Sequence, residues 1–193
     1  MSMSFMNLLW FKSSKKKAAE IGQYSLGRPF CKKGKLTKNI KIGIFHLTEQ
    51  GPMVMYKDFE ELKGITLTNV ELSKKIDTLA VNLIAATASG HAYVEGCFDF
   101  KLETVNKYRL LVIAISMPNF ASQDPRLKNG YYQIVLFIPK EISMNLPSIS
   151  KMEDQLYLIV RKEINEPSDF TNSKIQKLKN SLITQLDSFL IKN

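Results

Sequence analysis

The side chains best suited to catalysis in this chain of 193 residues belong to its two histidines and two cysteines. A catalytic site would have to use His46, His91 and Cys97, with the cysteine as the nucleophile. Cys97 alternates onto the same predicted strand face as Glu95 and Asp99, whose negative charges raise the pKa of a thiol and weaken it as a nucleophile. His46 shares a strand face with apolar side chains, and His91 begins a predicted strand. The pattern favours structural roles for all three residues.

Motifs that bind phosphate or carry hydrolytic chemistry are missing from the sequence. Gly27 and Gly34 are not followed by the Lys-Ser or Lys-Thr pair and helix of a phosphate-binding loop. No Gly-x-Ser-x-Gly or His-Glu-x-x-His sequence occurs. Cys31 and Cys97 are far apart and lack the spacing of a metal site, which favours a reducing, intracellular compartment. We therefore expect a protein that is not an enzyme and has no cofactor, metal or small-molecule substrate.

The net charge of +9 is confined to the N-terminal part of the chain. Residues 1–41 contain ten basic residues and one acidic residue, Glu20, which gives +9. Residues 42–193 contain 17 basic and 17 acidic residues and sum to zero. A nucleic-acid-binding domain usually shows a basic surface over the domain itself. The neutral body disfavours nucleic acid as a partner, and polyanions should be attracted only to the N-terminal part.

The sequence divides into an N-terminal basic arm, residues 1–39, and a folded domain, residues 40–193. The arm can dock into a groove of the body or stay free. It can also bind an anionic membrane, with apolar side chains in the interface and lysines among the head groups. This predicted membrane-binding site consists of Phe5, Leu8, Leu9, Trp10, Phe11, Lys12, Lys15, Lys16 and Lys17. No run approaches the roughly 18 apolar residues that a membrane span needs, so we expect a cytoplasmic protein that is peripheral on a membrane.

The domain is expected to begin with two strands, Ile40–Leu47 and Met53–Phe59, joined by a turn that contains Gly51 and Pro52. A helix is predicted from Thr68 to Gly90, where Thr68 and Glu71 form a capping box and Gly90 supplies the stop. Its apolar stripe recurs at helical spacing and comprises Leu72, Ile76, Leu79, Leu83 and Ala86.

Three more strands are predicted after this helix. His91–Leu102 alternates between apolar and polar residues, whereas Tyr108–Ser116 and Ile134–Ile138 are apolar throughout, as expected of strands covered on both faces. A long loop, Met117–Gly130, separates the last two strands. One helix should begin near Ser150, with Ser150 and Glu153 as a second capping box, and end at Pro167. Another should begin at Ser168 or Thr171.

The order β-β-α-β-β-β-α-α predicts an α+β fold with three layers, α-β-α. A five-stranded antiparallel sheet would have one helix on one face and the two C-terminal helices on the other. This order, together with the Gly51-Pro52 hairpin and the strand Ile134–Lys140 that runs into a helix pair, resembles the longin domain over residues 40 to about 193. Profilin and the roadblock domains have related three-layer folds.

The resemblance implies a non-enzymatic module of vesicle trafficking. Longin-like domains occur in regulatory heads of SNAREs, in coat adaptor and tethering subunits, and in heterodimers that recruit or activate small GTPases. No SNARE coiled coil follows the domain, which favours an adaptor or a subunit for small GTPase regulation. The expected protein partner is a small GTPase or another longin-like or roadblock-like chain. The predicted partner-binding residues lie on the outer face of the long helix and are Lys74, Lys75, Thr78 and Asn82; a solvated face is the alternative.

Two other functions remain open at this point. A nucleic-acid-binding protein would use the lysine-rich arm as a clamp, with Trp10, Phe11 and Tyr24 for base stacking. A profilin-like actin binder would rest on the related fold alone.

Overall fold

The structure is a computed structural model that describes residues 39–58, 69–89, 92–101, 107–118, 123, 127, 128 and 130–191. All of them belong to the compact unit Lys32–Asn193. The predicted membrane-binding residues, Thr68, Gly90 and His91 lie outside the described residues.

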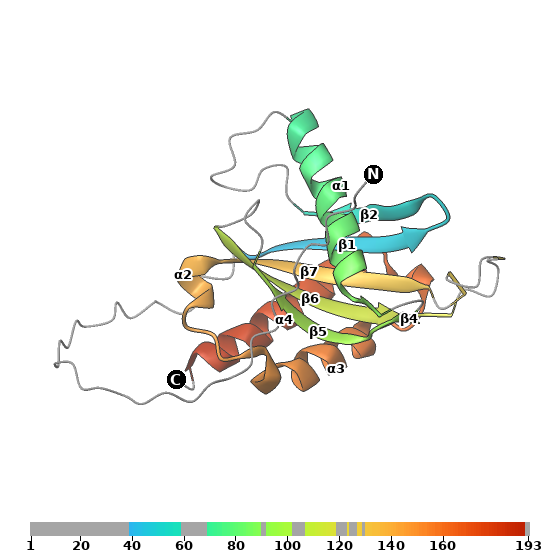
Figure 1. The fold of residues 1–193 in the computed structure, drawn as a ribbon. Helices are drawn as coiled ribbons and strands as arrows, with labels where there is room; N and C mark the ends of the chain where they lie inside the picture. The colour runs from blue at the N-terminus through green and yellow to red at the C-terminus, as the bar shows by residue number, and fades with distance from the viewer. Residues whose placement is uncertain are drawn as a thin grey trace. The chain divides into compact units, whose positions relative to one another are not determined.

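The strands form the five-stranded antiparallel sheet that the sequence predicts. Its order is β2-β1-β7-β6-β5, as Figure 1 shows. The strands are β1 (Lys41–Thr48), β2 (Gly51–Lys57), β5 (Gly96–Phe100), β6 (Tyr108–Ser116) and β7 (Tyr131–Pro139). A two-stranded ribbon that the sequence did not predict is formed by β3 (Ala88–Ser89) and β4 (Ala92–Tyr93).

Four α-helices occur in the described part of the chain. They are α1 (Asn69–Ala86), α2 (Lys140–Ser143), α3 (Glu153–Glu163) and α4 (Asn172–Ile191), with 3-10 turns at Ile149–Lys151 and Pro167–Asp169. The α+β class is therefore confirmed. The predicted element order lacked α2 and the β3–β4 ribbon.

The predicted end of the long helix was wrong. The helix α1 ends at Ala86. The Thr87 hydroxyl still bonds to the carbonyl oxygens of Leu83 and Ile84, at 3.1 and 3.2 Å, but the Thr87 carbonyl accepts the Val94 N–H at 3.0 Å. The chain then enters β3. Ala86 is exposed instead of buried. Among the α1 side chains that the structure describes, the buried apolar ones are Ile76, Leu79, Ala80, Leu83 and Ile84; Leu72 is not among the described side chains.

Two further boundaries differ from the prediction. The expected strand His91–Leu102 is interrupted between β4 and β5, next to Gly96 at φ +138°. The predicted capping box of Ser150 and Glu153 does not form. The Ser150 hydroxyl instead lies 3.1 Å from that of Ser148, and no side chain caps α3. That helix ends at Glu163, before Pro167.

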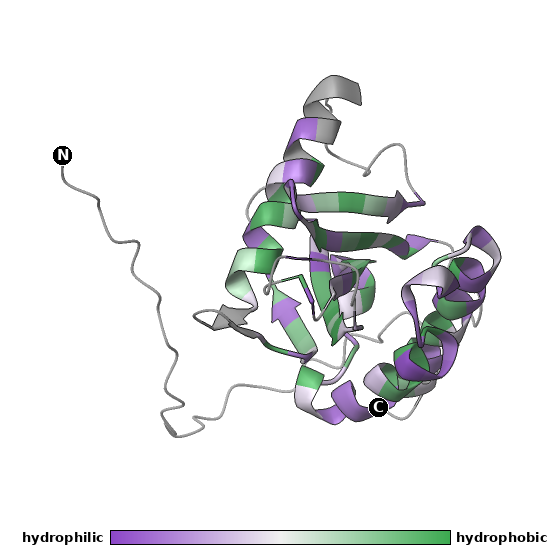
Figure 2. Cartoon of the chain, turned by 90° about the vertical axis from the view of Figure 1, so that its right-hand side faces the viewer, coloured by the Kyte–Doolittle hydropathy of each residue, from purple (hydrophilic) through white to green (hydrophobic). Residues whose placement is uncertain are grey.

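Two hydrophobic clusters use alternate residues of the same strands. One cluster joins α1 to Phe45, Val112 and Val135. The other joins α3 and α4 to Ile44, Ile113 and Ile134. Alternation follows from the two-residue period of a strand. The hydrophobic residues of α1, of the strands and of the C-terminal helices are coloured green in Figure 2.

The sequence of α4 carries apolar residues at helical spacing on one face. All five of them are buried, namely Ile175, Leu178, Leu182, Leu186 and Phe189. The backbone N–H of Lys174 donates to the hydroxyl of Thr171 at 3.4 Å, so the start at Thr171 is the correct one of the two predicted starts.

Gly130 closes the long loop between β6 and β7. Its carbonyl accepts the Met117 N–H at 2.8 Å, and its φ is +49°. A Cβ atom at position 130 would lie 2.1 Å from the Met117 carbonyl oxygen. Only glycine fits this position without a shift of the backbone.

Candidate functional site

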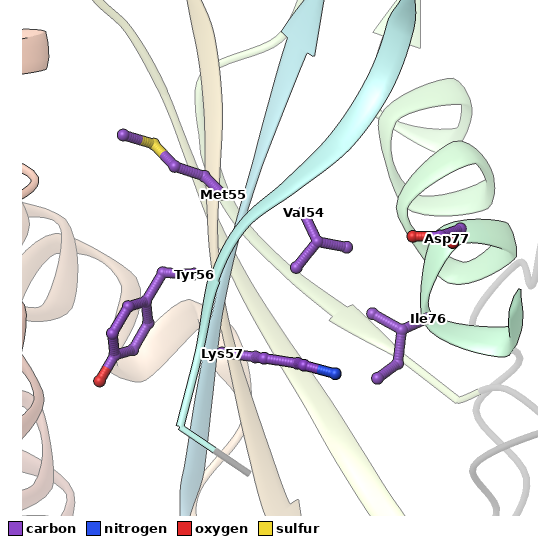
Figure 3. A pocket seen from close by; sticks show the side chains of 6 residues that line it. All are labelled: Val54, Met55, Tyr56, Lys57, Ile76 and Asp77. Atoms are coloured by element: carbon purple, nitrogen blue, oxygen red, sulfur yellow. The ribbon is translucent and has the colours of Figure 1, made fainter. Parts of the chain in front are cut away.

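An open hollow of about 350 Å³ lies between the edge strand β2 and the helix α1. Figure 3 shows the side chains that line it. Its lining combines apolar, aromatic and charged groups, and consists of Val54, Met55, Tyr56, Lys57, Ile76 and Asp77. We call this hollow the β2–α1 groove. It is the candidate functional site of the described part of the chain.

A β-bulge shapes the strand side of the groove. Ile44 pairs with Tyr56 and Phe45 pairs with Val54, so Met55 is an extra residue of β2 without a partner on β1. Val54 packs against the cluster that contains α1, and Tyr56 packs against the cluster that contains α4. In a regular strand, residues two apart share one face. The bulge therefore sends Val54 and Tyr56 to opposite faces and leaves Met55 45% exposed.

The helix side of the groove supplies Ile76 and Asp77. Ile76 is buried in the α1 cluster, whereas Asp77 is exposed. In Figure 3, Val54 and Lys57 point from β2 towards these two residues, and Met55 and Tyr56 point to the other side of the strand. Within the described part of the chain, neither Lys57 nor Asp77 makes an ion pair. An apolar floor between two unpaired charges suits a partner side chain that is itself apolar and flanked by polar groups.

The predicted partner-binding residues lie on the same helix. Lys74, Thr78 and Asn82 are exposed, as predicted. The Thr78 hydroxyl donates to the Lys74 carbonyl oxygen at 2.8 Å, which reduces its capacity to bind a partner. The side chain of Lys75 lies outside the described residues. None of the three described side chains lines the groove. The sequence predicted the strand β2, as Met53–Phe59, but did not assign it to a binding site. The signal that could have found it is the pair Met53 and Met55 on an edge strand, which are 46% and 45% exposed.

His46 occupies a structural position. Its ring stacks on that of Tyr132, with centroids 4.1 Å apart and planes 4° from parallel. Burial lowers the pKa of His46, so the neutral ring is favoured at neutral pH.

Cys97 is a poor nucleophile, but the predicted cause was wrong. Burial, followed by the negative charges of Glu153 and Asp154, raises its pKa to about 12. The two predicted neighbours have other partners: Asp99 pairs with Arg109 at 2.9 Å, and Glu95 bonds to Tyr157 and Arg161 of α3. Cys97 lies 3.6 Å from the Glu153 carbonyl oxygen as a hydrogen-bond donor.

A polar cluster that the sequence did not predict joins β6 and α3 around Glu95. One carboxylate oxygen accepts the Ser116 N–H at 3.0 Å. The other accepts the Tyr157 hydroxyl and Arg161, whose Nη2 lies 2.6 Å away. Burial opposes ionisation of Glu95, but the hydrogen bonds from Tyr157, Arg161 and Ser116 outweigh it and lower the pKa. Every oxygen is occupied by a neighbour within the fold, so the cluster stabilises the packing of α3.

In the described ranges, no group of three or more His, Cys, Asp or Glu side chains could hold a metal ion. No helix of these ranges is both long enough and apolar enough to cross a bilayer.

Comparison with known proteins does not assign this chain to a family. No protein-family model matches it. A search of curated protein sequences also gives no match.

Proposed function

We propose that this chain is a non-enzymatic, longin-like adaptor or small-GTPase-regulating subunit of membrane traffic. Its three-layer arrangement would place α1 on one face of the sheet and α3 and α4 on the other. Support comes from the two hydrophobic clusters, which join α1 and the C-terminal helices to alternate residues of the same strands. The strand-strand-helix start and the sheet that ends in a helix pair also agree with the resemblance to longin domains.

The observation that carries the proposal is the β2–α1 groove. It lies at an open edge of the sheet, its floor is apolar, and its charges on Lys57 and Asp77 have no ion-pair partner in the described ranges. The main-chain groups on the outer edge of β2 face no other strand of the sheet. Protein partners use such edges and the helices beside them. The partner we propose is a small GTPase or another longin-like or roadblock-like chain.

The second part of the proposed function is contact with a membrane through the basic arm. The sequence places four large apolar side chains, Leu8 to Phe11, directly before a cluster of lysines. Each basic residue near an anionic surface adds about 1 kcal/mol to binding. The protein would then be cytoplasmic and peripheral on a membrane.

Affinity capture with groove variants tests the protein-binding part. The full chain should recover a small GTPase or a longin-like chain. Lys57→Glu, at a side chain that points into the groove (Figure 3), should lower that recovery at least tenfold, by about 1.4 kcal/mol or more. The matched control is Lys162→Glu, which makes the same change in charge at an exposed lysine of α3. Equal recovery by the two variants would show that the partner does not bind at the groove. A monomer that recovers neither a small GTPase nor a longin-like chain would contradict the proposal.

Liposome flotation tests the membrane part. The full chain should float with vesicles that contain phosphatidylserine, and removal of residues 1–17 should reduce the bound fraction. Equal binding with and without these residues, or no binding at all, would reject the arm as the membrane contact.

A further inference from the structure

One end of the sheet carries exposed lysines at the ends of neighbouring strands. Lys41, Phe137, Leu110 and Phe100 form one row across β1, β7, β6 and β5. Three lysines lie just beyond this row, at the same end: Lys101 after β5, Lys107 before β6 and Lys140 after β7. The Lys140 N–H donates to the Lys107 carbonyl oxygen at 3.0 Å, which holds these two residues side by side.

These lysines differ from those of α4 in having no ion-pair partner. Lys101, Lys107 and Lys140 are exposed, and none of them forms a salt bridge within the described ranges. By contrast, the three lysines of α4 that follow Thr171 each pair with a carboxylate, of Asp169, Glu163 and Asp58 respectively. Charges without an internal partner remain available to an external one.

Nearby acidic groups do not neutralise this end of the sheet. Asp99 is paired with Arg109 at 2.9 Å, so that pair adds no net charge. Glu141 is exposed and lies next to Lys140. With Lys41 included, four lysines and Glu141 give +3; Glu103, in the segment 102–106 outside the described residues, lowers the total for the sequence to +2. The surface is therefore net positive.

An exposed methionine lies one helical turn after Lys140. Met144 is 82% exposed, the highest value of the large hydrophobic residues in the described part of the chain. Its N–H donates to the Lys140 carbonyl oxygen at 3.0 Å, so the two residues are one helical turn apart and share a face. Figure 1 shows α2, which contains Lys140, continuing from the end of β7. A large apolar side chain beside unpaired lysines is the composition of a surface that touches lipid.

β1 begins at this same end of the sheet. The sequence that precedes β1 is basic as well, because residues 1–38 contain nine basic residues and Glu20, a net +8. Single-stranded nucleic acid would need exposed aromatic side chains for stacking. Tyr108, at the start of β6, is only 7% exposed, so lipid fits this surface better.

We propose that this end of the sheet is a second membrane contact, specific for anionic head groups. Lys101, Lys107 and Lys140 contact lipid phosphates and carboxylates, and Met144 enters the interface between them. This inference rests on the proposed membrane contact of the arm and adds a contact made by the folded domain. An arm alone would tether the domain, whereas a second contact also orients it on the membrane.

Flotation of the full chain with charge-reversal variants tests this inference. The variant Lys101→Glu, Lys107→Glu, Lys140→Glu removes the proposed contact. The control Lys74→Glu, Lys151→Glu, Lys162→Glu makes the same change in net charge at exposed lysines outside this surface. With phosphatidylserine-containing vesicles, the first variant should lower the partition coefficient on the order of a hundredfold, at about fivefold for each lysine. The control should lower it far less, because salt screens distant charges.

A second pair of variants tests the apolar contact without a change in charge. Met144→Ser should weaken vesicle binding several-fold, whereas Leu158→Ser, at another exposed apolar residue, should not. Circular dichroism and thermal unfolding verify that each variant is folded. Equal binding by the two charge variants, equal binding by the two serine variants, or equal binding to pure phosphatidylcholine vesicles would overturn the inference. If the Lys101 set has no effect while removal of residues 1–17 abolishes binding, the arm remains the membrane contact and this surface does not.

Discussion

Asp58 and Lys179 form a salt bridge that joins the end of β2 to the middle of α4, 121 residues later in the sequence. The side chains are 8% and 14% exposed. The second carboxylate oxygen of Asp58 accepts the Ile42 N–H at 2.8 Å. One carboxylate therefore connects the edge strand, its neighbour β1 and a C-terminal helix, and it fixes the end of the strand that forms the β2–α1 groove.

Replacement of Lys179 should be strongly destabilising. Lys179→Met leaves a buried carboxylate without its counter-charge, and we expect the free energy of unfolding to fall by about 3 kcal/mol. Urea unfolding at neutral pH measures the change. Lys162→Met, at an exposed lysine of α3, should change it by less than about 0.5 kcal/mol. Similar values for the two variants would show that the salt bridge does not hold β2 in place.

Gln133 offers a test of a buried polar group in a central strand. Its Nε2 donates to the Thr87 hydroxyl at 2.7 Å and to the Leu83 carbonyl at 3.1 Å, while its Oε1 is buried without a partner in the described ranges. Gln133→Met removes the unpaired oxygen along with the two bonds, so we expect a loss of less than about 1 kcal/mol. Gln133→Glu should cost more than about 3 kcal/mol at pH 7, because it buries a carboxyl group. Similar losses of unfolding free energy for Gln133→Met and Gln133→Glu, measured by urea unfolding, would contradict the buried position of this side chain.

Glu95 should make stability depend on pH. Its pKa in the folded protein is lowered from 4.5, so between the two pKa values the unfolded chain binds more protons. The stabilisation by ionised Glu95 is complete above the unfolded pKa and is lost as the pH falls through the folded pKa. The difference in unfolding free energy between the wild type and Glu95→Gln should thus be largest at pH 7 and vanish in acid. Glu141→Gln, at an exposed carboxylate, is the control, and the same pH dependence in both would reject the role of Glu95.

Cys97 should react slowly with thiol reagents. Its pKa is raised from 9.0 to about 12, which lowers the thiolate fraction at neutral pH on the order of a thousandfold. In a Cys31→Ser background, iodoacetamide should modify the folded chain correspondingly more slowly than the chain unfolded in urea. Mass spectrometry gives the two rates. Equal rates in the folded and the unfolded chain would show that Cys97 is a reactive thiol and would contradict its raised pKa.

The sequence predicts the elements whose stabilising contacts repeat at a fixed spacing. Tyr108–Ser116 is found with the same limits, and the apolar residues that recur at helical spacing in α4 are buried. The element boundaries that were predicted wrongly depend on contacts that do not recur at such a spacing. After α1, the Thr87 carbonyl accepts the N–H of Val94, and Ser150 bonds to Ser148 instead of starting α3.

The candidate site was harder to predict than the core. The β2–α1 groove exists because the register shifts between Ile44 and Phe45, and a register shift belongs to a strand pair, not to either sequence alone. The cluster around Glu95 joins residues 62 and 66 positions apart. Neither arrangement leaves a periodic signal along the chain. The exposed lysines at the end of the sheet could not be predicted for a different reason. The net charge of residues 42–193 is zero, and this sum does not distinguish charges in salt bridges from charges without a partner.

The close contact of Gly130 with the Met117 carbonyl oxygen restricts how the sequence of this loop can change during evolution. The hydrogen bond between these residues fixes both ends of the loop, and the entropy of closing a loop rises only slowly with its length. Insertions and deletions between the two residues should therefore accumulate in descendants of this gene, while position 130 admits no side chain. Distant relatives should therefore share a glycine directly before the buried apolar strand β7. The segment that precedes this glycine should vary in length, so the glycine can be used to align their sequences.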